Sequence, residues 1–122
     1  MTVHFILEAK GRDVATASPD TALKDIAAQL AERKIGALVI VDGATVKGIV
    51  SERDLVPHIA DNGSAALEMA VSQCMTSKVI SCQPSETIDD VMGKMTAGRF
   101  RHLPVIQDGQ LAGIISIGDV VK

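Results

Sequence analysis

The sequence predicts an α/β (α+β) fold built from two pseudo-symmetric units, each with the order strand, helix, strand, strand, helix, packed together through their sheets. Its 122 residues suit a single domain or two small joined halves, and 47% of them are hydrophobic. The third observation is an internal repeat, because a shift of 65 residues aligns residues 14–56 with residues 79–121 without a gap. The identical pairs are Val14/Val79, Pro19/Pro84, Asp25/Asp90, Leu38/Leu103, Gly48/Gly113, Ile49/Ile114, Ser51/Ser116, Asp54/Asp119 and Val56/Val121.

Each copy begins with a short apolar stretch, at residues 14–17 and 79–82, which a proline soon follows. This pattern predicts a brief strand that enters a turn. A helix comes next, because apolar residues at spacings of three and four form one stripe in each copy. The stripes are Leu23, Ile26, Ala27 and Leu30 in the first copy and Ile88, Val91, Met92 and Met95 in the second.

A β-hairpin follows the helix in each copy. Two apolar, β-branched runs flank an Asp-Gly turn at residues 42–43, and the second copy repeats them around residues 108–109. Pro104 cannot donate to a β-ladder, so its strand must expose that position at an edge or beside something other than a strand. The closing helices are expected to begin near Ser51 and Ser116. One such unit cannot cover both faces of its own sheet, which explains the duplication.

The repeat divides the chain into three segments. Residues 1–62 form the first copy with an N-terminal helical lead-in, residues 63–75 a connecting helix, and residues 76–122 the second copy. Only six residues follow Ser116, so either the last helix is short or the native chain is longer.

Composition excludes several classes of protein. A formal charge of −3, with no Trp or Tyr and only two Phe, argues against a nucleic-acid-binding surface. The apolar runs are far shorter than the roughly 20 residues of a membrane helix, and the N-terminus lacks the pattern of a secretory signal. We therefore expect a cytoplasmic protein. Cys74 and Cys82 show no metal-ligand spacing, which predicts reduced, at least half-buried thiols and no metal site.

The motif that occurs twice is Gly, two apolar residues, Ser, any two residues and Asp, at residues 48–54 and 113–119. One interpretation is structural, because Ser and Asp three positions apart cap a helix N-terminus. The other is functional: free amides at a helix start favour a phosphate, and a carboxylate beside them can accept the two hydroxyls of a ribose. The cations Arg99, Arg101 and His102 precede a strand of the second copy and favour phosphate, although they could also be a solvated face.

The double motif, the order of the elements and the Arg-His-Leu-Pro-Val run at residues 101–105 together resemble a tandem pair of cystathionine-β-synthase (CBS) domains, the Bateman module, over residues 14–121. The Ser-Glu-Arg-Asp-Leu run at residues 51–55 is similar to the small stand-alone bacterial members. The resemblance implies a regulatory module that binds an adenosine derivative, most often AMP, with ADP, ATP, S-adenosylmethionine and NAD(H) as variants. It also implies a module that performs no chemistry.

The resemblance also implies two binding sites, each shared between the copies. In site one Asp54 would hold the ribose hydroxyls, Ser51 and Arg53 the phosphate side, and the region of Ile80 and Leu103 the base. The residues expected at site one are Ser51, Arg53, Asp54, Ile80, Ser81, Arg101, His102 and Leu103, and those at site two are Ala15, Thr16, Gly36, Ala37, Leu38, Ser116 and Asp119. Site two has Gly118 where site one has Arg53, and we expect it to hold phosphate poorly or to rely on a partner chain.

The leading hypothesis is an adenine-nucleotide-binding regulatory module that works as a homodimer, with four CBS motifs in a disc, and that acts on an unidentified regulated protein. The alternative is a ligand-free dimerisation adaptor in which the repeated Ser and Asp serve only as helix caps. A small hydrolase is the third hypothesis, but no nucleophile and base pair can be assembled from the sequence.

Overall fold

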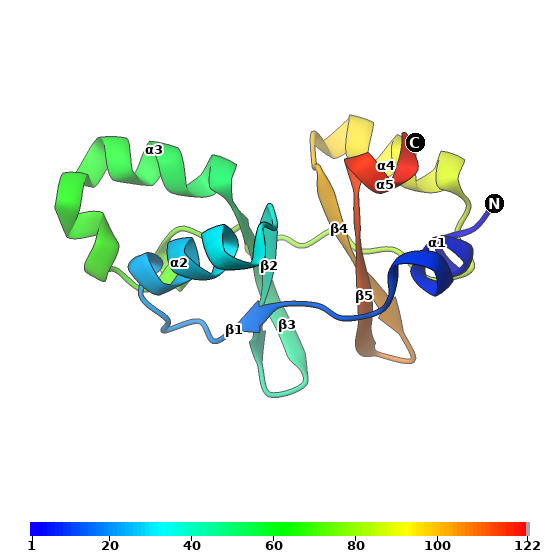
Figure 1. Ribbon diagram of the computed structural model, residues 1–122, viewed down its shortest axis with the longest axis horizontal. Helices are drawn as coiled ribbons and strands as arrows, with labels where there is room; N and C mark the ends of the chain where they lie inside the picture. Colours follow the sequence, from blue (N-terminus) through cyan, green and yellow to red (C-terminus); the bar gives the residue numbers. More distant parts are fainter. Residues whose placement is uncertain (122) are drawn as a thin grey trace. The chain divides into compact units, whose positions relative to one another are not determined.

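The computed structural model describes residues 1–121, and over this range the chain is a mixed α+β protein with five α-helices and two small sheets (Figure 1). The elements in chain order are α1 (Val3–Lys10), β1 (Thr16–Ala17), α2 (Leu23–Arg33), β2 (Ala37–Asp42), β3 (Thr45–Ser51), α3 (Glu52–Asn62), the 3₁₀ helices η1 (Gly63–Glu68) and η2 (Val71–Gln73), α4 (Ile88–Gly98), β4 (His102–Gln107), β5 (Gln110–Ser116) and α5 (Ile117–Val120).

Two compact units account for these elements, and each has its own sheet and core. The first unit is Ala15–Val79, and the second combines Met1–Val14 with the chain from Ile80 onward. The N-terminal helix, which the sequence interpretation grouped with the first copy, thus belongs by its contacts to the second unit.

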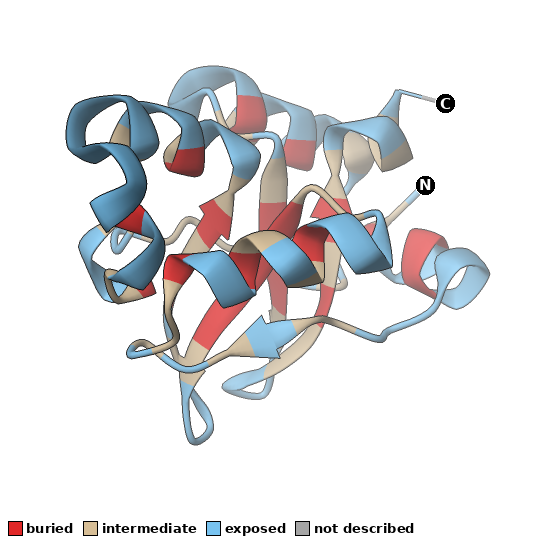
Figure 2. Ribbon diagram, turned by 60° about the vertical axis from the view of Figure 1, so that its left-hand side comes forward, coloured by how far each residue is buried: buried red, intermediate tan, exposed pale blue. Residues whose placement is uncertain are grey.

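The first unit has a three-stranded sheet. Strand β1 pairs with β2 in parallel, and β2 pairs with β3 in the predicted hairpin, whose Gly43 has the positive φ of 61° that a tight turn needs. Figure 2 shows buried residues on the strands and on one face of the helices. The core consists of Leu23, Ile26, Leu30, Leu38, Ile40, Val50, Leu55, Ala66 and Val71, which confirms the apolar stripe predicted for α2.

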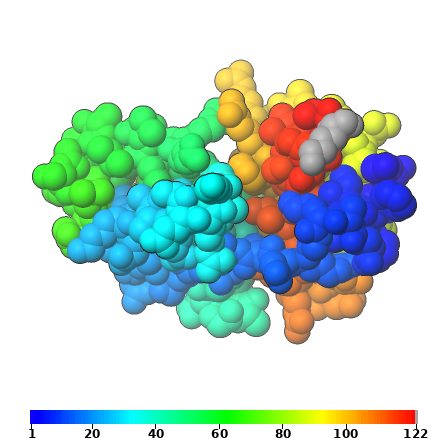
Figure 3. Space-filling view, viewed as in Figure 1, coloured from blue at the N-terminus to red at the C-terminus, as the bar shows by residue number. Residues whose placement is uncertain are grey.

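The second unit has a two-stranded sheet of β4 and β5, joined by a turn in which both Asp108 and Gly109 have positive φ. Its core consists of Val3, Ile6, Leu7, Cys82, Val91, Met95, Leu103, Val105 and Ile115. Helix α5 has only four residues. Helix α1 supplies three of the core side chains, and Figure 3 shows this blue N-terminal segment beside the orange and red residues of the same unit.

The strand predicted at residues 79–82 is reduced to a single parallel bridge between Cys82 and Val105. The first copy explains the loss, because there the Val39 amide donates to the Ala15 carbonyl at 3.1 Å. Pro104 occupies the position equivalent to Val39 and has no N–H to donate. The second copy therefore keeps only the bonds on either side of Cys82, from its own amide to Pro104 and from the Ile106 amide to its carbonyl.

The segment predicted as a connecting helix forms the two 3₁₀ helices η1 and η2 instead of one α-helix. Gly63 ends α3 with a φ of 63°, and Met69 and Ala70 are extended, which separates the two 3₁₀ turns. Beyond them, Thr76 pairs with Ile49 through two backbone hydrogen bonds of 2.9 and 3.0 Å. The connection thereby runs along the free edge of β3.

The repeated glycine of the motif lies where another segment comes very close to the sheet edge. A Cβ at Gly48 would lie 2.8 Å from the Thr76 carbonyl oxygen, and a Cβ at Gly113 would lie 2.8 Å from Cδ2 of Leu7 in α1. Both distances are too short for a side chain, so glycine permits the contact in each unit. Helix α1 thus covers in the second unit the edge that residues 75–76 cover in the first.

Candidate functional site

Both repeated motifs form a capping box at the end of a strand. The Ser51 amide donates to Oδ2 of Asp54 at 2.8 Å, and the Ser116 amide donates to Oδ2 of Asp119 at the same distance. In the second motif the Asp119 amide also donates to the Ser116 hydroxyl at 3.2 Å. The structural interpretation of the motif is therefore confirmed, and each aspartate is held in a fixed position.

Among the described residues, the hydrogen-bond donors to the half-buried Asp54 carboxylate in the first unit are neutral groups. The Thr76 hydroxyl lies 3.5 Å from Oδ1, a long contact, and the Ser51 hydroxyl lies 3.3 Å from Oδ2. The Cys74 thiol donates to the Asp54 carbonyl at 3.1 Å. Burial, and secondly the negative charge of Asp54, raise the pKa of that thiol. Oδ1 is thus left with one weak neutral donor and can accept further hydroxyls.

A cation engages the Asp119 carboxylate in the second unit. Lys10, at the end of α1, places Nζ 2.7 Å from Oδ2 of Asp119 and 3.0 Å from the Ile114 carbonyl oxygen. Burial works against ionisation of Asp119, but the Lys10 hydrogen bond, the Ser116 amide and the Lys10 charge together hold the pKa of this carboxyl below its ordinary value. The two aspartates thus form the same kind of helix cap, but only Asp119 has a described cation beside it.

The cations of the second unit stand at the turn between α4 and β4. Arg99 ends α4 in the left-handed conformation, with φ of 58°, which reverses the chain before Arg101. The Arg101 carbonyl accepts the Ile117 amide at 2.8 Å, so the backbone at Arg101 is tied to the start of α5. Arg101 is exposed, as is Arg53 in the first unit, and neither forms an ion pair with any described carboxylate. Both guanidinium groups are available to an anion.

The other site-one residues of the second unit lie in two adjoining stretches. Ile80 and Ser81 are half-buried just before the Cys82 bridge, and His102, also half-buried, begins β4. Leu103 is fully buried in the core, so its side chain packs the unit and only its backbone remains for a ligand.

The site-two residues of the first unit meet where β1 lies against β2. Thr16 pairs with Val39, and Ala15 and Gly36 directly precede the two strands. Ala37 and Leu38 begin β2 and are buried, Leu38 completely. These residues offer backbone groups and the exposed Thr16 side chain, and no cation.

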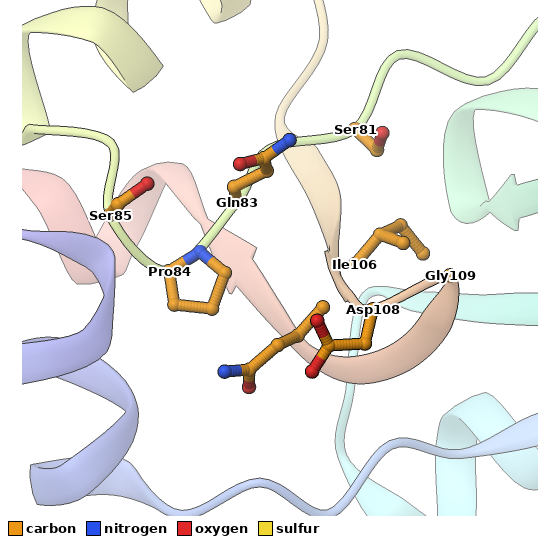
Figure 4. Close-up of a pocket in the computed structure, with 8 residues that line it drawn as sticks. Ser81, Gln83, Pro84, Ser85, Ile106, Asp108 and Gly109 are labelled. Atoms are coloured by element: carbon orange, nitrogen blue, oxygen red, sulfur yellow. The ribbon is translucent and has the colours of Figure 1, made fainter.

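An open cavity of about 600 Å³ lies beside the β4–β5 turn of the second unit (Figure 4). Figure 4 shows the Asp108 carboxylate and the side chains of Gln83 and Pro84 around it. Its lining is Ser81, Gln83, Pro84, Ser85, Ile106, Gln107, Asp108 and Gly109. Ser81 is therefore the one predicted site residue on this cavity, and neither motif aspartate reaches it.

Three side chains near the predicted residues were missed by the sequence interpretation. They are Lys10 and Thr76, which contact the motif aspartates, and Lys94, whose Nζ donates to the Ser81 carbonyl at 2.8 Å and pairs with Glu86 at 2.7 Å. Extending the repeat upstream would have helped, because the shift of 65 residues aligns Lys10 with Met75, next to Thr76.

Metal-ligand clusters and membrane-spanning helices are both absent from the part of the chain that the structure describes. Residues 1–121 contain no group of three or more His, Cys, Asp or Glu side chains that could hold a metal ion. Within the same range, no helix has the length and apolar character required to cross a membrane. Both cysteines are free, Cys82 buried and Cys74 half-buried, as predicted.

Solved structures similar to this chain are CBS-domain proteins. A CBS-domain-containing protein from Agrobacterium tumefaciens is 50% identical with a TM-score of 0.97, and the match covers 99% of this chain and 97% of that one. The CBS domain pair of protein MJ0100, solved in complex with 5′-methylthioadenosine and S-adenosyl-L-methionine, is 26% identical with a TM-score of 0.87, over 98% of this chain and 92% of that one.

A curated relative and the family model agree with the structures. The mitochondrial CBS-domain-containing protein CBSX3 of Arabidopsis thaliana is 31% identical over 99% of this chain, which spans 63% of that relative's length. The family model for the CBS domain matches residues 9–61 and again residues 71–122. Together with two units that carry the same motif on the same elements, these matches show that the chain belongs to the CBS domain family, as a tandem pair.

Proposed function

We propose that this CBS domain pair is a regulatory module that binds an adenine nucleotide. The observation that carries the proposal is the Asp54 carboxylate, which the Ser51 amide holds in place and which accepts hydrogen bonds from neutral groups alone among the described residues. A fixed carboxylate with weak neutral donors that a ligand can displace suits the vicinal hydroxyls of a ribose, because charge-assisted hydrogen bonds are about twice as strong as neutral ones.

The surrounding charges suit the phosphate of the same ligand. Arg53 and Arg101 are exposed and carry no ion pair with a described carboxylate. We propose that they hold the phosphate together with Ser51 and His102, and that Asp54 holds the ribose. Ile80, Ser81 and the backbone at Leu103 would contact the base. Without Trp or Tyr, that contact uses aliphatic side chains and amides.

We expect AMP to be the preferred ligand, with ATP, ADP and NAD(H) sharing its adenosine end. The adenosyl compounds bound to the CBS pair of MJ0100 support the ligand class. The module would act by binding alone, on a regulated protein that is not yet identified. Two free cysteines suit a reducing compartment, and we propose a cytoplasmic location.

A ligand-free adaptor is the second candidate, and the two capping boxes favour it. Each motif aspartate already accepts a hydrogen bond from the Ser amide of its own motif and so caps a helix, a structural role that needs no ligand. The adaptor and the sensor are distinguished by whether adenine nucleotide binds and by whether binding depends on Asp54.

Purified protein is expected to carry or take up adenine nucleotide. A chain without Trp or Tyr absorbs little at 280 nm, so a co-purified nucleotide is seen as a band at 260 nm, and mass spectrometry of the released compound identifies it. After removal of any bound nucleotide, AMP at 100 times its Kd should stabilise the fold by about 2.7 kcal/mol, measured as a rise in Tm. A Tm that is unchanged by AMP, ATP and NAD at millimolar concentrations would contradict the proposal.

We also propose that the module is a homodimer, because apolar side chains remain exposed on its helices. On α3, Val56 is 66% exposed and Ile59 is 40% exposed, three positions apart on one helix face. The matched change is Val56→Asp, compared with Glu52→Asp on the same helix. Light scattering should give about twice the chain mass of 12.8 kDa for the parent and Glu52→Asp, and a shift toward 12.8 kDa for Val56→Asp. A single-chain mass for the parent would exclude the dimer.

A further inference from the structure

The two units satisfy equivalent acceptors in different ways, which is visible when they are aligned by the 65-residue shift. In the first unit the Thr76 backbone amide donates to the Ile49 carbonyl at 2.9 Å, and the Thr76 hydroxyl lies 3.5 Å from Asp54. In the second unit the single ammonium of Lys10 donates to the Ile114 carbonyl and to Oδ2 of Asp119, the oxygen that also accepts the Ser116 amide. A cation thus replaces two neutral donors.

This replacement uses up the acceptor capacity of one Asp119 oxygen. Oδ2 accepts the Ser116 amide at 2.8 Å and the Lys10 ammonium at 2.7 Å, and a carboxylate oxygen has about two lone-pair positions. At Asp54 the second donor to Oδ2 is the rotatable Ser51 hydroxyl at 3.3 Å, a neutral group that can turn away. The second lone-pair position of Oδ2 can therefore be vacated for a ligand hydroxyl at Asp54, whereas at Asp119 the Lys10 ammonium holds it.

The Lys10–Asp119 pair is also well placed to persist. Its side chains are only 33% and 17% exposed, and α1 is fixed in the core by Val3, Ile6 and Leu7. The lowered pKa of Asp119 agrees with a carboxylate that stays ionised against Lys10. Lys10 itself lies on α1 of the same unit as Asp119, so this contact is internal to the second unit.

We propose that Lys10 determines the stoichiometry of the module by occupying the ribose-binding carboxylate of site two, which leaves site one as the nucleotide site. This inference rests on the proposed adenine-nucleotide function and adds which of the two motif aspartates is used. Lys10 is a specificity-determining residue in this sense: it competes with the ribose for Asp119. Gly118, which provides no cation where the first motif has Arg53, leaves site two with little else to attract a phosphate.

The test is Lys10→Met, because methionine is the residue at the equivalent position 75 of the first unit. Calorimetric titration with AMP should give one AMP per chain for the parent and two for Lys10→Met, with affinity at site two raised about tenfold or more, the size expected when a charged hydrogen bond no longer competes. The gain should disappear in the double variant Lys10→Met with Asp119→Ala.

Lys24→Met is the matched control. Lys24 lies on α2 and pairs with Glu68 at 3.0 Å, so this variant loses the same charge and a similar ion pair at another place. It should keep one AMP per chain. Melting curves verify that each variant is folded.

Every outcome decides the inference. Two AMP per chain in the parent, or one in Lys10→Met, overturns the role of Lys10 and leaves the proposed function intact. No binding to the parent but Asp119-dependent binding to Lys10→Met supports the role of Lys10 and overturns the function assigned to Asp54. No binding to either protein overturns both.

Discussion

Replacing Leu7 by alanine is expected to lower the free energy of unfolding by about 2 to 5 kcal/mol, the range for a buried leucine truncated in a close-packed core. Leu7 is 1% exposed and contacts the backbone of Gly113 in β5, where no side chain could fit. The alanine would leave a cavity beside β5 that the glycine cannot fill. Thermal unfolding should show a fall in Tm of roughly 10 °C or more.

Phe5→Ala on the same helix is the matched control. Phe5 is larger than Leu7 but 61% exposed, so its truncation should change stability by less than about 0.5 kcal/mol. Equal, small effects at both positions would mean that α1 does not complete the core of the second unit. A large effect at Leu7 alone would show that the N-terminal helix is part of that unit, even though most of the second copy lies more than 65 residues away in sequence.

The helices, the hairpins and the two copies could be predicted because they depend on local patterns. Apolar spacing placed α2 and α4, and the Asp-Gly turns placed both hairpins. The capping boxes at Ser51 and Ser116 also follow from residues three positions apart. In each case the interacting groups are close in sequence, so a local sequence pattern is enough to predict the contact.

The errors and omissions involve groups that are distant in sequence. The sequence interpretation predicted a strand at residues 79–82, but the structure has a single bridge there. The partner strand carries Pro104, which has no N–H, and this loss has an effect only because the fold brings the two segments side by side. Lys10 and Asp119 are separated by 109 positions, and the sequence around α1 does not indicate which group the Lys10 ammonium contacts. The repeat offered only a clue, since Lys10 aligns with the residue before Thr76, and the contact of Thr76 with Asp54 is visible only in the structure.

Removing the Asp54 carboxylate should weaken AMP binding by about 10- to 150-fold. This factor corresponds to about 1.5–3 kcal/mol, the usual contribution of hydrogen bonds to a charged group. Asp54 is the motif carboxylate that forms no ion pair with a described cation, so its hydrogen bonds to a ligand face no competing charge. Titration of AMP into Asp54→Ala at fixed ionic strength measures the change, and the parent measured in parallel provides the reference.

The difficulty is that Asp54 also caps α3, so Asp54→Ala should lose about 1 kcal/mol of stability whether or not a ligand exists. Asp90→Ala separates the two effects, because Asp90 accepts the Thr87 amide at 3.0 Å in the same kind of capping box at the start of α4, outside the repeated motif. Both variants should lose similar stability, and only Asp54→Ala should lose affinity for AMP. If both leave AMP affinity unchanged, the carboxylate of the repeated motif is a helix cap and the adaptor is the better description, because a ribose held by Asp54 cannot be indifferent to its removal.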